Sequence, residues 1–455
     1  MEKTTSAPTK EAAPVADAEA NDTAANSPDE PRAKIYPKGW KLHALTFGLC
    51  LSMLLSTLET TIVSTSLVSM VNALGGFSQA GWVVTSYFLT YTGFLIIYAK
   101  MSDILGTKVL IMFAVALFAI FSVACGFSNT MLQLIIFRSI QGMGGSGIYS
   151  LVTVMTPLMV PPAKYPTYIA IISSVFAISS VLGPILGGVI SDSATWRWVF
   201  WLNGPPGALA IILIGISIPF SFPYPGPVRF FSSLMSQRAW TRVDFLGAFT
   251  SLAASILLVF ALEQAGIEYP WDGAAIITSF VLSGLLWCIF VGWERTLSLR
   301  NTACEPMFPW RLVCNRLVLG LLLNAFLTGF PFMAALINIP QRFQVVNGTT
   351  AIDAGIRMLP LLLCSPFATI LSSLIISRLK VAPLYILLGG CSLQAIGAGL
   401  FSSLDSSDLN IPPSQYGFQV IMGFGFGFNL STVLMMVPLV VKQKDMGSFS
   451  SILPY

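Results

Sequence analysis

The chain has 455 residues, of which 55% are hydrophobic and only 10% are charged. Soluble domains carry about 25% charged residues, so this chain could not cover a water-exposed surface with polar groups. The net charge of +4 is too small to indicate nucleic-acid binding. His43 is the single histidine, and the seven cysteines form no CxxC pair, so we predict no metal site and treat the cysteines as small apolar residues. Composition predicts a chain largely surrounded by lipid.

Residues 1–41 are predicted to be a disordered tail. The segment is polar and rich in Ala, Pro, Thr, Asp and Glu, and it lacks the apolar core of a cleavable signal peptide. Such a segment cannot bury enough apolar surface to fold on its own.

Apolar runs follow the tail in regular succession, and each is close to the roughly 20 residues that a transmembrane helix needs. Internal Gly and Pro do not argue against helices here, because membrane helices tolerate them. The fold class is therefore an all-α polytopic membrane protein with about twelve spans. These are Leu42–Ser64, Gly81–Ala99, Val109–Phe127, Met131–Met155, Tyr168–Ile190, Val199–Phe220, Phe245–Leu262, Ala274–Val291, Leu317–Ile339, Gly355–Ile376, Pro383–Phe401 and Tyr416–Val441.

The loop charges orient these spans. If the tail is cytoplasmic and the spans alternate, only Arg197, Arg342 and Arg357 fall on the outer side, while Arg138 lies within a span. The remaining 20 of the 24 Lys and Arg residues fall on the inner side. This bias agrees with the positive-inside rule and predicts a cytoplasmic N-terminus.

The first span contains LETTIVSTSL at Leu58–Leu67, in which Glu59 is an acid in or near the membrane. Removal from water favours the protonated form of a carboxyl group, so Glu59 is a candidate proton carrier. The alternative is an interfacial acid that only ends the span.

The fourth span contains FRSIQGMGGSG at Phe137–Gly147, with the lone arginine Arg138. A cation within the membrane costs at least about 2.5–3.5 kcal/mol, so Arg138 must face protein or a water-filled cavity. We expect it to couple to a proton carrier or to pair with Glu59. The alternative is structural pairing with backbone carbonyls. The glycines of this segment permit close helix contact.

Two segments indicate conformational roles. In YAKMSDILGTK, Gly106 permits a tight turn, and Asp103 can cap the next helix or pair with a neighbouring cation. In LGPILGG at Leu182–Gly188, the proline kinks the helix and the glycines let another helix pack over it, as in a span that rocks during alternating access. The residues concerned are Gly183, Pro184, Gly187 and Gly188.

Two further segments are placed on the outer side. WRWVFWLNGPPG at Trp196–Gly207 has three tryptophans and Arg197, and we interpret it as an interfacial anchor with no role in chemistry. The loop after the ninth span contains Asn347-Gly348-Thr349, a sequon that predicts glycosylation of Asn347.

In their order along the chain, these segments resemble the major facilitator superfamily, and within it the fourteen-span drug:proton antiporter family. LETTIV resembles its first-span motif, which usually has Asp where Glu59 stands. FRSIQGMG resembles the fourth-span motif, whose arginine, here Arg138, is linked to proton coupling. MSDILGTK, LGPILGG and WRWVFWLNGPPG resemble its loop motif, fifth-span antiporter motif and entry to span six. The segment Ile339–Pro360 resembles the region between spans nine and ten.

The loop motif departs from the family pattern at two positions. Ala99 stands where glycine is usual, and Thr107 stands where an arginine usually supports a charge relay that closes the cytoplasmic side. Lys108 is expected to substitute in part for that arginine.

The resemblance implies a division of the chain. An N-terminal six-helix bundle (42–220) is followed by a cytoplasmic linker (221–243), two extra helices (244–293), a cytoplasmic loop (294–316) and a partial C-terminal bundle (317–455). Spans thirteen and fourteen are absent, which implies either a truncated gene product or a twelve-span variant.

The function expected from the resemblance is export of small lipophilic molecules, such as drugs, toxins or secondary metabolites, by proton antiport. No cofactor beyond the proton gradient is expected, and the partners are the substrate and the lipid bilayer. The long tail and the lone intramembrane charges suit a monomeric, multi-pass pump of the fungal type in the plasma membrane. The alternatives are proton-coupled uptake of a siderophore or nutrient, and a truncated protein that does not transport. An enzyme is not expected, because the spans lack paired acids, a Cys/His pair or metal-ligand spacing.

Overall fold

The computed structural model describes residues 36–161, 164–219, 222, 244–300, 304, 306–307, 310–404 and 410–440. Helices make up the regular structure of this part of the chain, and no strand occurs among these residues. The predicted all-α class is therefore confirmed. Most of the predicted tail, nearly all of the 221–243 linker, parts of the 294–316 loop and the last fifteen residues lie outside the described ranges.

Each predicted span corresponds to one long helix or to two consecutive helices. Short helices η2 (Phe77–Gln79) and α12 (Trp310–Val313) lie between them. The helices are α1 (Trp40–Leu74), α2 (Ala80–Leu105), α3 (Thr107–Gly126), α4 (Met131–Met159), α5 (Tyr165–Ser193), α6 (Trp198–Trp201), α7 (Gly204–Ser217), α10 (Phe245–Gln264), α11 (Ala274–Leu299), α13 (Arg316–Val345), α14 (Ala351–Arg357), α15 (Leu359–Leu379), α16 (Pro383–Ser402) and α17 (Ser414–Val440).

The outer surface of these helices is apolar. Within the described part of the chain, nine helical segments are long and apolar enough to cross a membrane. Large apolar side chains lie exposed on many helices, as at Phe249 of α10 and Val281 of α11, which are 68% and 67% exposed. A soluble protein could not tolerate so much exposed apolar surface, so lipid must cover it. The chain is a multi-pass membrane protein.

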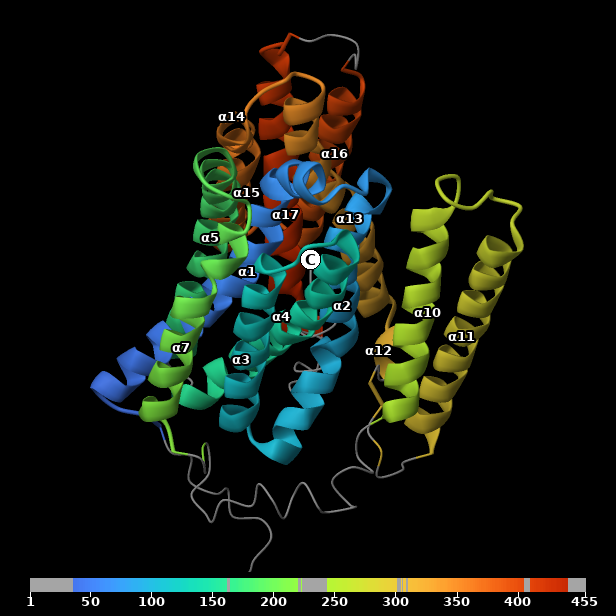
Figure 1. Ribbon diagram of the computed structural model, residues 1–455. Coiled ribbons are helices and arrows are strands. Elements are labelled where there is room, and N and C mark those ends of the chain that lie inside the picture. Colours follow the sequence, from blue (N-terminus) through green and yellow to red (C-terminus); the bar gives the residue numbers. More distant parts are fainter. Residues whose placement is uncertain are drawn as a thin grey trace, which may run out of the picture.

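Helices α1 to α7 form a first bundle around a buried apolar core (Figure 1). The glycines of α4 bring its backbone against neighbouring helices, as the glycine-rich pattern predicted. A Cβ added at Gly144 would lie 2.5 Å from the backbone nitrogen of Phe118 on α3. A Cβ at Gly147 would lie 2.6 Å from the Cβ of Ala114, also on α3. Such close approach is the usual way for membrane helices to gain packing contacts.

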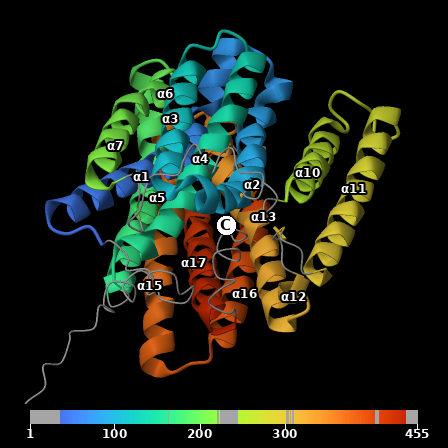
Figure 2. The ribbon, with the colours of Figure 1, turned by 90° about the horizontal axis from the view of Figure 1, so that it is seen from below.

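Helices α13 to α17 form a second bundle, in which α17 packs between α15 and α16 (Figure 2). Glycines again lie at the contacts. A Cβ at Gly423 would lie 2.6 Å from the carbonyl oxygen of Leu361 on α15, and one at Gly425 would lie 2.8 Å from the Cα of Gln394 on α16. The ring of Phe332 on α13 meets that of Phe426 on α17, with 5.0 Å between centroids.

Helices α10 and α11 form a hairpin that stands to one side of both bundles in the two views (Figures 1 and 2). It packs against the first bundle through α10 and α2. Thr85 of α2 donates a hydrogen bond of 2.7 Å to the carboxylate of Glu263 on α10. Gly93 of α2 leaves room for the side chain of Leu252. The hairpin is thus attached to the bundle that contains α1 and α4.

Candidate functional site

Glu59 and Arg138 form an ion pair inside the first bundle. Glu59 lies within α1 and Arg138 lies within α4, and Arg138 Nη1 is 2.5 Å from Glu59 Oε1. Their side chains are 0% and 1% exposed. Because α1 continues to Leu74, Glu59 does not end the helix, which removes the interpretation of this acid as a terminator at the interface. The pairing expected for these two residues is present.

Arg138 also binds the groups around it. Its Nε donates to the carbonyl oxygen of Val83 at 3.1 Å, and its Nη1 donates to Gln141 Oε1 at 3.0 Å. The guanidinium carbon lies 4.4 Å from the centre of the Tyr87 ring. Arg138 therefore pairs both with Glu59 and with a backbone carbonyl.

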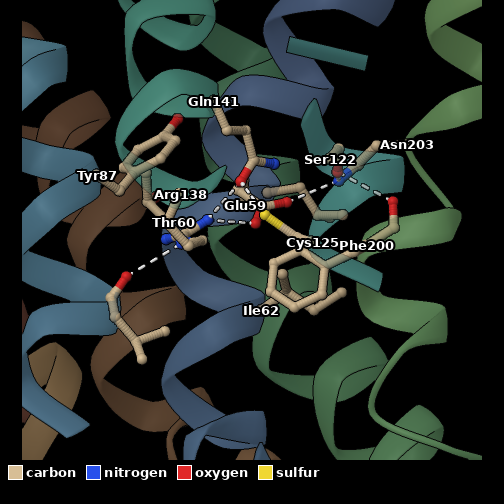
Figure 3. Close-up of polar contacts among 12 residues, drawn as sticks. Glu59, Thr60, Ile62, Tyr87, Ser122, Cys125, Arg138, Gln141, Phe200 and Asn203 are labelled. Atoms are coloured by element: carbon tan, nitrogen blue, oxygen red, sulfur yellow. Dashed lines mark hydrogen bonds and ion pairs between the residues drawn. The ribbon is translucent and has the colours of Figure 1, made fainter. Parts of the chain in front are cut away.

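Asn203 holds the second oxygen of the Glu59 carboxylate (Figure 3). Its Nδ2 donates to Glu59 Oε2 at 2.7 Å and to Ser122 Oγ at 2.7 Å. Ser122, on α3, donates in turn to the carbonyl oxygen of Phe200 at 3.0 Å. The side chains that surround Glu59 thus come from α2, α3, α4 and the α6–α7 connection.

Asn203 stands where the chain breaks between α6 and α7. Two prolines occupy the first turn of α7, where their missing N–H groups cost nothing, so the polar residue before them can turn inward. The sequence interpretation treated this segment as an anchor without a chemical role and missed Asn203. The available signal was an amide side chain directly before Gly-Pro-Pro in an otherwise apolar stretch.

The geometry of the site compensates the cost of burying charge. A buried carboxylate or guanidinium loses several kcal/mol of hydration, and the loss is recovered only with close pairing and satisfied hydrogen bonds. Here each carboxylate oxygen has a donor within 2.7 Å, and the two charges cancel. A proton added to Glu59 would remove the negative charge that balances Arg138.

The other polar residue of the Trp196–Gly207 segment has a structural place. Arg197 donates to the carbonyl oxygen of Gly126, the last residue of α3, at 2.8 Å and to that of Ser128 at 2.5 Å. Its guanidinium carbon lies 4.7 Å from the centre of the Trp196 ring. Arg197 therefore joins the start of α6 to the end of α3, away from Glu59.

The loop motif connects α2 and α3 and supports α7. Gly106 has φ = 84°, a left-handed conformation that glycine adopts without strain. Lys108 is buried, and its Nζ donates to the carbonyl oxygens of Gly215 at 2.7 Å and Ile218 at 2.6 Å. These carbonyls end α7, where a cation also interacts favourably with the helix dipole. The side chain of Asp103 lies outside the described residues.

The LGPILGG segment of α5 contributes to two different interfaces. Within the first bundle, Gly183 lies against Thr61, and a Cβ at Gly187 would lie 2.5 Å from the carbonyl oxygen of Ile62. Gly188 instead faces the second bundle, where an added Cβ would lie 2.5 Å from the carbonyl oxygen of Ala351. Pro184 lies inside the continuous helix, and its carbonyl oxygen faces Gly355 of α14.

Polar contacts reinforce this junction of the bundles. The carboxylate of Asp192, near the end of α5, accepts hydrogen bonds from the backbone nitrogens of Ala351 at 3.3 Å and Ile352 at 2.9 Å. Gln344 of α13 donates to the carbonyl oxygen of Thr65 on α1 at 3.0 Å. Both bundles are therefore held together at the end where α1 and α5 terminate. The predicted orientation makes this the outer side.

Asn347 lies on the connection between α13 and α14. Its side chain is half-buried, and Nδ2 donates to the carbonyl oxygen of Asn410 at 3.5 Å. Glycosylation of this residue stays a prediction. Nowhere in the described ranges do three His, Cys, Asp or Glu side chains gather as a metal ion would require.

Two helical bundles, a lipid-covered surface and a buried ion pair are the features of a membrane transporter. The sequence model of the Major Facilitator Superfamily matches residues 49–453, and the chain belongs to this superfamily. The resemblance given by the ordered motifs is thereby confirmed.

Curated relatives are transporters of fungi and bacteria. The chain is 64% identical to MFS-type transporter FPY5 of Fusarium mangiferae over 92% of this chain and 71% of the relative. It is 33% identical to Multidrug resistance protein 3 of Bacillus subtilis, over 85% and 71% of the two chains. Efflux pump bfoC of Aspergillus brasiliensis is 28% identical, over 92% and 72%. Relatives named as efflux pumps support membership of the drug and metabolite efflux family.

The fold is also that of solved transporters. A bacterial homologue of the human lysosomal transporter Spinster, in an inward-facing and unoccupied conformation, matches with a TM-score of 0.58 and 16% identity. The match covers 91% of this chain and 79% of that structure, and it concerns the fold alone.

Proposed function

We propose that this transporter exports small lipophilic organic molecules, such as drugs, toxins or secondary metabolites, in exchange for protons. The observation that carries the proposal is the buried Glu59–Arg138 pair, in which Asn203 and Arg138 each hold one carboxylate oxygen. A buried acid with this environment is suited to bind and release a proton during transport. The names of the multidrug and efflux relatives support the direction of transport.

Coupling would act through the helices that meet at Glu59. While Glu59 is ionised, it holds Arg138 on α4 and Asn203 before α7 in fixed positions. Protonation removes the charge, and both neighbours lose a charge-assisted hydrogen bond. Because these groups lie on different helices, the change in charge alters how α1 packs against α4 and α7. The proton gradient is thereby the only energy source that the mechanism needs.

Alternating access would use the junction between α5 and α14. In the observed conformation the bundles are joined there, so a substrate approaches from the opposite end, which is the cytoplasmic side in the predicted orientation. Opening of this junction would release the substrate outward, and a proton would then reach Glu59 from the outside. Few charges lie in the spans, which favours neutral or weakly charged substrates.

The orientation, location and assembly belong to the same proposal. The bias of basic residues supports a cytoplasmic N-terminus, and an exporter of toxic compounds would act in the plasma membrane. Both bundles belong to one chain, and we propose that it functions as a monomer. Asn347 would then lie on the outer side, where glycosylation is possible.

Transport into inside-out vesicles tests the proposal. Vesicles from yeast that express the chain, with an acidic lumen, should accumulate tritiated fluconazole, a neutral lipophilic probe, or ethidium, a lipophilic cation. Glu59→Gln and Arg138→Ala should abolish accumulation at normal expression. Glu263→Gln provides a matched control, because Glu263 joins α10 to α2 away from the ion pair.

Two results would contradict the proposal. Normal gradient-driven accumulation by Glu59→Gln would exclude this residue as the proton carrier. Gradient-dependent uptake in whole cells, without accumulation in inside-out vesicles, would indicate a symporter that imports its substrate.

A further inference from the structure

Asn203 carries a polar atom that the observed site does not use. The residue is 0% exposed, and its Nδ2 makes two hydrogen bonds, to Glu59 and Ser122. Its Oδ1 is buried and has no hydrogen-bond partner among the described residues. A buried carbonyl oxygen without a donor is unfavourable and uncommon in folded proteins. The observed arrangement therefore satisfies the donor half of this amide and leaves the acceptor half unused.

The observed orientation suits only the ionised form of Glu59. An ionised carboxylate accepts hydrogen bonds at both oxygens, and here both are occupied by N–H donors, from Arg138 and Asn203. A protonated carboxyl group has an O–H that must find an acceptor. Nδ2 of Asn203 cannot accept a hydrogen bond. Protonation at Oε2 would therefore place two hydrogens against each other unless the amide turned.

A half-turn of the Asn203 amide would resolve this conflict. It would bring Oδ1 to the place now held by Nδ2, where it can accept from protonated Glu59. Ser122 can follow, because a hydroxyl both donates and accepts, and its O–H can rotate from the carbonyl oxygen of Phe200 toward Asn203. That carbonyl keeps a donor, since the backbone nitrogen of Asn203 also lies 3.2 Å from it.

Three other side chains near Glu59 differ from Asn203 in their hydrogen bonding. Arg138 of α4 only donates, and Tyr87 of α2 lies with its ring over the guanidinium. Cys125 of α3 directs its thiol toward Gln141 Oε1, at 3.8 Å. Asn203 is the neighbour placed on Glu59 Oε2 that has both a donor and a free acceptor on one side chain.

We propose that Asn203 is a positioning residue whose amide turns with the protonation state of Glu59, donating to the carboxylate and accepting from the carboxylic acid. Glu59 then keeps a hydrogen-bond partner at Oε2 both with and without its proton. The proposal rests on the proposed function in one respect, that Glu59 is the proton carrier.

Infrared difference spectroscopy on the full chain in lipid nanodiscs reads both groups at once. Between alkaline and acidic buffer, the wild-type spectrum should gain a carboxylic-acid C=O band and show a shift of a side-chain amide C=O band. Labelling of asparagine at the side-chain amide identifies the second band. Glu59→Gln should abolish both changes, and Asn203→Leu, which matches the amide in size, should abolish only the amide shift.

The pH midpoint of Glu59 protonation gives a second readout. Asn203→Leu removes a hydrogen bond to the ionised carboxylate, so the midpoint of the carboxylic-acid band should move by about one to two pH units toward alkaline pH. In Asn203→Thr, whose hydroxyl can donate and accept, the midpoint should lie closer to that of the wild type. If Asn203→Leu does not fold, Asn203→Thr, which also lacks the amide, assigns the asparagine band.

The outcomes separate the two proposals. A carboxylic-acid band that depends on Glu59, together with an asparagine band that does not change with pH, would overturn the amide switch and leave Glu59 as proton carrier. Absence of any Glu59-dependent band would remove the proton carrier itself, and with it the reason for the switch.

Discussion

Gly188 offers the sharpest test of the bundle junction. A Cβ added there would lie 2.5 Å from the carbonyl oxygen of Ala351 and 2.6 Å from the Cα of Ile352. Both atoms belong to the backbone of α14, so no side-chain rotation can relieve the contact. Gly188→Ala must therefore move α14 away from α5.

The size of the effect follows from the cost of overpacking. An extra carbon in a tightly packed contact costs about 1–3 kcal/mol. At Gly188 this cost falls only on the conformation in which the bundles meet at α5 and α14. It should change the ratio of closed to open molecules by about 5- to 150-fold. Gly183→Ala instead presses on Thr61 within the first bundle, so it should lower stability without changing this ratio.

Pulsed electron paramagnetic resonance measures this ratio directly. Spin labels on cysteines at Thr195 and Asp353, both exposed, report the separation of the ends of α5 and α14. Exposed native cysteines are replaced by serine. Gly188→Ala should add a population at longer distance, and Gly284→Ala should not, because no described atom lies within 4 Å of its added Cβ. Identical distance distributions for wild type and Gly188→Ala would refute the reasoning.

Three further predictions concern charged side chains. Asp192→Asn weakens the carboxylate contact with the start of α14 and should destabilise the closed conformation by about 0.3–1 kcal/mol. The same labels should therefore show a smaller open population than in Gly188→Ala, and no change from the wild type would exclude a role in closure. Arg138→Met leaves a buried carboxylate unpaired and should lower the free energy of unfolding by about 3–5 kcal/mol. The double variant with Glu59→Gln should recover most of this loss in thermal unfolding. Additive losses in the double variant would contradict the pairing. Lys108→Met removes the cationic donor of the carbonyls that end α7 and should lower the free energy of unfolding by about 1.5–3 kcal/mol in the same assay. Lys108→Arg keeps a cationic donor and should lower it less. Equal stability of both variants would contradict this role.

The membrane spans follow directly from the sequence because lipid imposes a long, apolar stretch on every crossing helix. The apolar runs did not predict where two of the spans break into shorter helices or how far α1 extends. Prolines start α7 and α15, so the sixth and tenth predicted spans each consist of two helices. Helix α1 extends to Leu74, ten residues beyond the predicted end, because its later polar residues pack against α5 and α13 instead of facing water.

The candidate site was only partly visible in the sequence. Glu59 and Arg138 could be predicted because a charged side chain in an apolar run must face the protein interior or a water-filled cavity. Asn203 and Ser122 carry no charge, and nothing in the chain order shows that the α6–α7 break lies beside α1 and α3. The contact of Asp192 with α14 could not be predicted either, because 159 residues separate Asp192 from Ala351.

Transport by Glu59→Gln in proteoliposomes tests the central claim most directly. Two modes are compared for tritiated fluconazole: accumulation driven by an acidic lumen, and exchange against unlabelled probe without a pH gradient. Because the variant keeps the shape of the site but cannot bind a proton there, it should lose gradient-driven accumulation and keep exchange. Gradient-driven accumulation equal to that of the wild type would contradict proton coupling through Glu59.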